Sequence, residues 1–99
     1  MAVYVGTIKY PFGRMIMFHM ASPDVEELHQ MADKIGIARK WFQDNKNHVN
    51  PHYDVCKSKK MLAIRYGAIE VNDRELIKIC FPKLRDMMNK PSPDKPKQP

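Results

Sequence analysis

The stretch RMIMFHMASPDVEELHQMADKIG, residues 14–36, decides the fold because an extended apolar run gives way in it to an amphipathic helix. Residues 14–21 are almost all apolar, over a length typical of an interior strand. Apolar residues then recur at helical spacing at Val25, Leu28, Met31, Ala32 and Ile35. The stretch therefore predicts a strand followed directly by a helix that packs one face on the core.

Residues at both ends of this predicted helix suit its termini. Ser22 is expected to cap the amino end, with Pro23 in the first helical position. Three acidic residues follow at the positive end of the helix dipole, and Gly36 can close the helix.

Further elements are expected on both sides of this stretch. They are strands at 2–5, 37–43 and 68–71, and helices at 55–66 and from 72 onward. Asn72 followed by Glu75 resembles a capping box, and Pro82 should kink or end the last helix. The alternation predicts an α/β fold with a small, largely parallel sheet of three to four strands and about three helices. We expect a single domain over 1–90 and a disordered Pro/Lys-rich tail over 91–99.

The charge balance indicates the kind of partner. Seventeen Lys and Arg against eleven Asp and Glu give a net charge of +6, which favours nucleic acid, a nucleotide or an acidic protein. No membrane segment or secretory signal is apparent, so we expect a cytoplasmic protein with no membrane partner. Cys56 and Cys80 form no paired motif and are expected to be reduced, with no role assigned.

Several residue types suited to anion binding occur near predicted helix starts. In HYDVCKSKK, residues 52–60, an imidazole, a phenol and lysines can donate to a phosphate, although a solvated basic face is the alternative. Trp41 is either a core residue or a platform for a base beside Arg39. His19 and His29 are either packed, hydrogen-bonded residues or ligands of a site.

Metal and catalytic motifs are weaker. His48, His52 and Cys56 recur at every fourth position, but Pro51 argues against the helix that would align them, so no metal site is predicted. No phosphate-binding loop or dinucleotide motif occurs, so no cofactor is expected. The acidic residues show no spacing that singles out a catalytic pair, and catalytic residues stay unassigned.

The chain resembles a family of small proteins from phages, prophages and bacteria that is classed as a domain of unknown function. The resemblance covers about residues 3–77 and is carried by VYV, GRMIMFHM, EELHQMADKIGIARKWFQ, HYDVCKSKKMLAIRYGAIEV and REL. It implies no established activity. The family pattern has an aspartate where this chain has Gly6, and often a cysteine where it has Phe18. Loss of that carboxylate removes a candidate metal ligand or base.

Polar positions that recur in the family pattern imply a joint site. They match Arg14, His19, Glu27, His29, Arg39, His52, Tyr53, Asp54, Ser58 and Lys59. We therefore predict an anion-binding pocket formed by Arg14, His19, His29, Arg39, His52, Tyr53 and Lys59. The expected occupant is a nucleotide or related phosphorylated small molecule.

By analogy with small viral proteins, we expect a phage accessory protein that sequesters a nucleotide signal of host defence, as a homo-oligomer whose interfaces complete the pocket. A phosphoesterase or nuclease using histidine acid and base chemistry is one alternative. A nucleic-acid-binding module is another.

Overall fold

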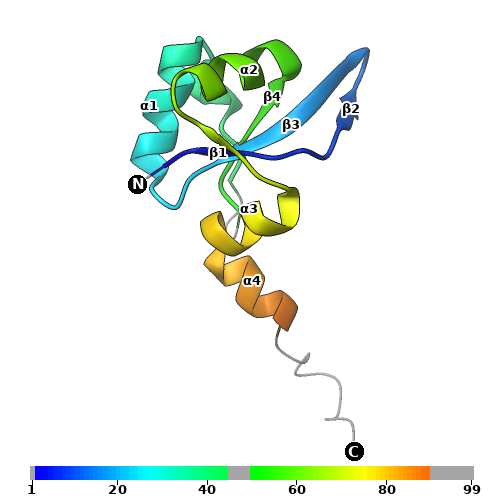
Figure 1. Ribbon diagram of the computed structural model, residues 1–99, viewed down its shortest axis with the longest axis vertical. Helices are drawn as coiled ribbons and strands as arrows, with labels where there is room; N and C mark the ends of the chain where they lie inside the picture. Colours follow the sequence, from blue (N-terminus) through cyan, green and yellow to red (C-terminus); the bar gives the residue numbers. More distant parts are fainter. Residues whose placement is uncertain (1, 45–49, 90–99) are drawn as a thin grey trace, which may run out of the picture.

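The fold is a mixed β-sheet with helices on both faces (Figure 1). The structure is a computed structural model that describes residues 2–44 and 50–89. Its elements in chain order are β1 (Tyr4–Val5), β2 (Tyr10–Phe12), β3 (Met15–Ala21), α1 (Val25–Ile35), the 3-10 helix η1 (Arg39–Trp41), β4 (Tyr53–Cys56), α2 (Lys57–Arg65), β5 (Ile69–Glu70), α3 (Asp73–Cys80) and α4 (Pro82–Asn89). The predicted tail over 91–99 lies outside the described residues.

Strand β3 is the centre of the sheet. Met17 of β3 pairs with both Tyr10 of β2 and Cys56 of β4, so these two strands lie on opposite edges of β3. β1 pairs antiparallel with the end of β3, on the same edge as β2. Among the described strands, only β1 and β5 pair in parallel. The α/β class is confirmed, but the prediction of a largely parallel sheet of three to four strands is wrong.

The reason for the antiparallel arrangement lies in the connections. β2 and β3 are joined by a short turn with Gly13 at φ 61°, and a turn of this length can join only antiparallel strands. The segment 37–43, predicted as a strand, instead contains η1, where Trp41 donates its N–H to the carbonyl of Ala38. Only Gln43 of this segment bridges to the sheet, at His52.

Helix positions agree with the sequence prediction except at some termini. α1 is capped by Asp24, whose side chain accepts from the N–H groups of Glu26 and Glu27, and not by Ser22. The Ser22 hydroxyl instead donates to the carbonyl of Ala2. The second helix was predicted over 55–66, but α2 begins at Lys57 because residues 53–56 form β4.

The predicted cap at Asn72 is confirmed, since its side chain accepts from the N–H of Glu75 at the start of α3. α4 begins at Pro82, directly after the break at Phe81. None of the helices in the described part of the chain has the length and apolar character needed to span a lipid bilayer.

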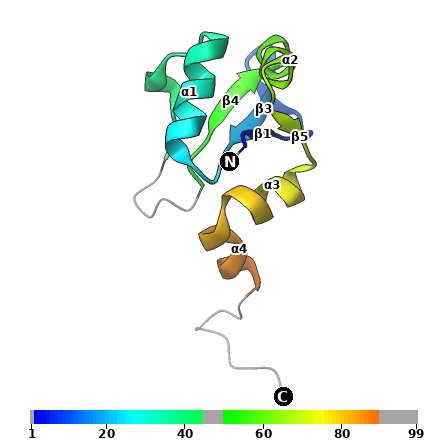
Figure 2. The same ribbon diagram turned by 60° about the vertical axis from the view of Figure 1, so that its left-hand side comes forward.

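The two faces of the sheet carry different contacts. Phe18 and Met20 of β3 are buried with α1 and α2, in the larger of two apolar clusters. Ala21 points to the other face, where it packs with Leu76 of α3. Figures 1 and 2 show α3 and α4 on the side of the sheet away from α1 and α2. Because side chains alternate along a strand, His19 points to the face of α3.

Candidate metal centre

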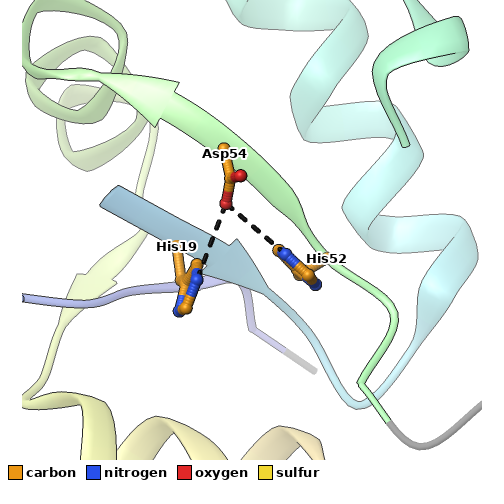
Figure 3. Close-up of side chains that lie close together, drawn as sticks. All are labelled: His19, His52 and Asp54. Atoms are coloured by element: carbon orange, nitrogen blue, oxygen red, sulfur yellow. Dashed lines mark ion pairs between the residues drawn. The ribbon is translucent and has the colours of Figure 1, made fainter. Parts of the chain in front are cut away.

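Three potential metal ligands converge on the α3 face of the sheet: His19, His52 and Asp54 (Figure 3). His19 of β3 and Asp54 of β4 are directly paired across the two strands. His52 precedes β4 by one residue and lies two positions from Asp54. The two-residue period of extended chain therefore places all three side chains on one face.

The carboxylate of Asp54 faces both imidazoles, whose rings contact each other edge to face with centroids 4.8 Å apart. Its Oδ1 atom lies 3.4 Å from Nε2 of His52 and 3.6 Å from Nε2 of His19. Its Oδ2 atom accepts a 2.7 Å hydrogen bond from Nε2 of Gln43, which fixes the orientation of the group. Oδ1 is buried and accepts no well-aligned hydrogen bond from the described residues.

The outer ring nitrogens of both histidines have partners of their own. Nδ1 of His52 lies 2.6 Å from the carbonyl oxygen of Asn50, and a carbonyl can only accept, so Nδ1 carries the hydrogen. Nδ1 of His19 lies 3.3 Å from Oδ2 of Asp73. When the rings are neutral, Nδ1 carries the hydrogen, and Nε2 of each ring lies within 3.6 Å of Oδ1 of Asp54 with its lone pair unused. Outer partners hold metal-binding histidines in the same way.

Asp73 joins α3 to the segment between β1 and β2. It is 5% exposed, and its Oδ1 atom accepts from the N–H groups of Thr7 at 2.8 Å and Ile8 at 2.9 Å. A Cβ atom on Gly6 would lie 2.4 Å from this oxygen. Gly6 therefore leaves the space that the Asp73 carboxylate occupies.

Tyr10 covers the outer side of His19. The two rings stack with centroids 4.3 Å apart, and the Tyr10 hydroxyl lies 3.5 Å from Oδ2 of Asp73. Burial and the neighbouring charge of Asp73 raise the pKa of Tyr10. The phenol therefore stays protonated and donates to the carboxylate.

The pKa values of the ionisable groups in the cluster are shifted in different directions. Burial and the positive charge of His52 lower the pKa of His19. Burial also opposes the charged form of His52, but its contacts with Asp54 and the Asn50 carbonyl outweigh burial and raise the pKa. The interaction with His52 lowers the pKa of Asp54. The cluster thus favours an ionised carboxylate beside a neutral His19.

This arrangement fits a small divalent cation. Each residue offers one ligand atom, and all three atoms lie within 4.8 Å of one another. An ion bound tetrahedrally at about 2.0–2.2 Å holds its ligands roughly 3.3–3.6 Å apart, close to the two distances from Asp54 Oδ1. Two imidazoles and a carboxylate suit zinc and other first-row divalent metals, and leave a coordination position open.

The structure brings together His19 and His52 of the seven predicted anion-binding residues. His29 and Tyr53 meet on the opposite face of the sheet, where Nδ1 of His29 lies 2.6 Å from the hydroxyl of the fully buried Tyr53. The packed, hydrogen-bonded alternative therefore describes His29 and Tyr53.

The other three predicted residues lie apart from this cluster. Arg39 pairs with Asp33 at 3.0 Å on the exposed side of α1. Nζ of Lys59 donates to the carbonyl of Ile35 at the end of α1. Arg14 lies at the exposed turn before β3.

Asp54 and Asp73 contact the two histidines, but the predicted pocket did not contain them. The spacing of His52 and Asp54, two residues apart in extended chain, is a signal that could have identified the first. Asp73 had no comparable signal, because its contacts come from a helix far along the chain. His48, His52 and Cys56 were noted above for their spacing at every fourth position. His48 lies outside the described residues, and His52 lies close to Asp54 and not in a ligand group with Cys56.

The fold and site define a small α/β protein with a partly buried cluster of two histidines and one aspartate. The chain belongs to the family described as protein of unknown function DUF4031, which matches residues 3–82 and confirms the resemblance to a domain of unknown function. Comparisons with curated proteins and with solved structures gave no match.

Proposed function

We propose that this protein is a metal-dependent phosphoesterase that binds a divalent cation through Nε2 of His19, Nε2 of His52 and Oδ1 of Asp54. The main support is the convergence of these atoms with both Nδ1 atoms already bound elsewhere. A pair of histidines serving only as packing residues would not need both Nε2 atoms to face the same oxygen.

The Oδ1 atom of Asp54 favours a bound cation over a group of charged side chains that has only a structural role. Buried polar atoms in proteins almost always have a hydrogen-bond partner, yet Oδ1 has no well-aligned one among the described residues. A cation in front of this oxygen would satisfy it, and would also use the two Nε2 lone pairs. Outer-shell contacts of the kind made by Asp73 and Asn50 are typical of histidine metal ligands.

His19, His52 and Asp54 would leave one coordination position of a tetrahedral ion for water, and zinc in such a site would lower the pKa of that water to about 7. In the proposed reaction, the water oxygen forms a bond to phosphorus while the bond from phosphorus to the ester oxygen breaks. The electron pair of that bond stays on the leaving oxygen, which takes up a proton released from the water. The products are an alcohol and inorganic phosphate.

A phosphate ester is the favoured substrate because of charge. The protein carries a net charge of +6, and Lys40 and Lys59 line the groove that reaches Asp54. Positive charge next to a site raises the local concentration of anionic ligands. A cation at the centre would stabilise the charge that develops on the phosphoryl oxygens.

Metal binding is tested by calorimetric titration of metal-free protein with Zn²⁺ and Mn²⁺. The wild type should bind one ion, and His19→Ala and Asp54→Asn should each lose more than the roughly 10–100-fold typical of outer-shell changes. Arg39→Ala removes an exposed cation away from the cluster and should bind like the wild type. Equal metal binding by wild type and His19→Ala would refute the site.

Hydrolysis is tested with p-nitrophenyl phosphate and with a nucleoside monophosphate. We expect metal-dependent release of phosphate that is lost on chelation, restored by adding metal and absent in Asp54→Asn. A protein that only sequesters a nucleotide would bind it and return it chemically unchanged. That result would reject the esterase while leaving the metal site intact.

A further inference from the structure

A groove opens beside the candidate metal centre. It has a volume of about 500 Å³ and is lined by the β2–β3 hairpin, the segment 37–43 and β4. This volume lies within the range of roughly 300–1,000 Å³ found for small-molecule sites. Asp54 belongs both to the groove and to the His19–His52–Asp54 cluster. Asp54 is thus the residue through which the groove adjoins the cluster, since neither His19 nor His52 lines it.

The walls of the groove are mostly apolar and aromatic. Its large side chains include Phe12, Met15, Trp41 and Phe42. Trp41 is 59% exposed and Phe12 is 69% exposed, so neither ring is used to fill the core. Exposed aromatic rings gathered at a concave surface are typical of a ligand-binding site.

Positive charge accompanies these rings. Nζ of Lys40 lies 5.3 Å from the centroid of the Trp41 ring. Lys59 also lines the groove; one of its ammonium hydrogens is used at the Ile35 carbonyl, and an ammonium has three. The groove thus combines a flat aromatic surface with cations and a candidate metal centre.

We propose that the substrate is a nucleotide, with its base stacked on Trp41 and its phosphate directed to the Asp54 end of the groove. This inference rests on the proposed phosphoesterase function and specifies its substrate class. Stacking on an aromatic side chain recognises any nucleobase, because every base has a π face. Lys40 and Lys59 neutralise the charge of the phosphate between the base and the centre.

Trp41 is the only tryptophan in the chain, so its fluorescence reports directly on this groove. Metal-free protein, which is not expected to hydrolyse either compound, is titrated with adenosine monophosphate and, separately, with ribose 5-phosphate, which has the phosphate and sugar but no base. We expect the nucleotide to quench the fluorescence and to bind roughly 5- to 100-fold more tightly than the sugar phosphate.

The Trp41→Ala variant, measured by calorimetry, should lose this preference while its metal affinity is unchanged. Tyr66→Ala serves as the matched control, because Tyr66 is also an exposed aromatic residue, at 52% against 59% for Trp41, and does not line the groove. Its preference for the nucleotide should equal that of the wild type.

Equal affinity for both compounds, or a preference that survives in Trp41→Ala, would overturn the inference. If the wild type also binds metal and hydrolyses both compounds alike, the phosphoesterase proposal stands and only the nucleotide assignment fails. If the wild type binds no metal, the proposed function fails at its first step, whatever the nucleotide titration shows.

Discussion

Nδ1 of His19 and Oδ2 of Asp73 lie 3.3 Å apart, so the start of α3 holds a ring of the central strand by its outer nitrogen. In Asp73→Asn the charge is removed while the size of the side chain is kept. We expect metal affinity to fall by roughly 10–100-fold, because the outer partner no longer orients the ring or increases its basicity. Calorimetric titration measures this, and Glu75→Gln on the same helix is the control. Unchanged affinity in Asp73→Asn would contradict an orienting role.

Gly6→Ala should disturb the contact between His19 and Asp73 by displacing the Asp73 carboxylate. The new Cβ would lie 2.4 Å from Oδ1 of Asp73, so the carboxylate must move. We expect a loss of about 1–3 kcal/mol in the free energy of unfolding, together with weaker metal binding. Gly67→Ala is the control: Gly67 has φ 108° and open space around it, so its strain should lower stability without changing metal affinity. Urea unfolding and metal titration of both variants check this.

Tyr53→Phe tests the structural role of the contact between His29 and Tyr53, which lies on the face of the sheet that α1 and α2 cover. The change removes a hydroxyl that lies 2.6 Å from Nδ1 of His29. We expect the free energy of unfolding to fall by about 0.5–1.5 kcal/mol, the usual value of such a hydrogen bond. Metal binding and hydrolysis should not change. Chemical denaturation measures the first effect, and a loss of activity at unaltered stability would argue against a packing role.

Lys60 is one of the lysines that the sequence placed at a helix start, but its side chain is only 7% exposed. Its Nζ atom lies 2.7 Å from Oε2 of Glu70 and 4.1 Å from the centroid of the Phe18 ring. Glu70→Ala should destabilise the protein by about 1–2 kcal/mol, because it leaves a buried ammonium unpaired; the half-exposed Glu70 keeps the loss below that of a fully buried pair. Lys60→Met should be less destabilising. Thermal unfolding ranks the two variants, and the reverse order would contradict this account.

The two cysteines should differ in reactivity. Burial raises the pKa of Cys80 to about 12, whereas the hydrogen bond with Ser58 lowers the pKa of Cys56. Thiolate is the reactive form, so labelling of Cys56 should level off at a lower pH than for a free thiol. An Ellman titration of the folded protein at pH 8 should count one fast thiol, and none in Cys56→Ser. Two fast thiols in the native protein would contradict the buried position of Cys80.

Local signals in the sequence were sufficient to predict α1, α2 and α3, although not all of their termini. The periodicity of 25–35 and the cap at Asn72 depend on neighbours within a few residues, and both are confirmed. Strand direction depends instead on the route of the connecting chain. The segment 37–43 has an extended pattern, but residues 39–41 form η1, and β4 runs antiparallel to β3.

The candidate site was predicted only in part, because it too depends on contacts between segments that are distant in the sequence. His19 and His52 were singled out by residue type, and the structure brings them together. The third residue of the cluster required the knowledge that His52 and Asp54 belong to one extended segment, which the sequence analysis did not predict as a strand. Asp73 required the packing of α3 against β1, and no local pattern contains that contact.

The carboxylate of Asp73 has a consequence for how the molecule assembles. Between β1 and β2, the amides of Thr7 and Ile8 bond to this side chain, which arrives with α3. Slow exchange of these two amide hydrogens with deuterium would therefore report that α3 has docked. His19 gains its outer partner in the same step, so closure of the amino-terminal segment and alignment of the imidazole form one cooperative unit.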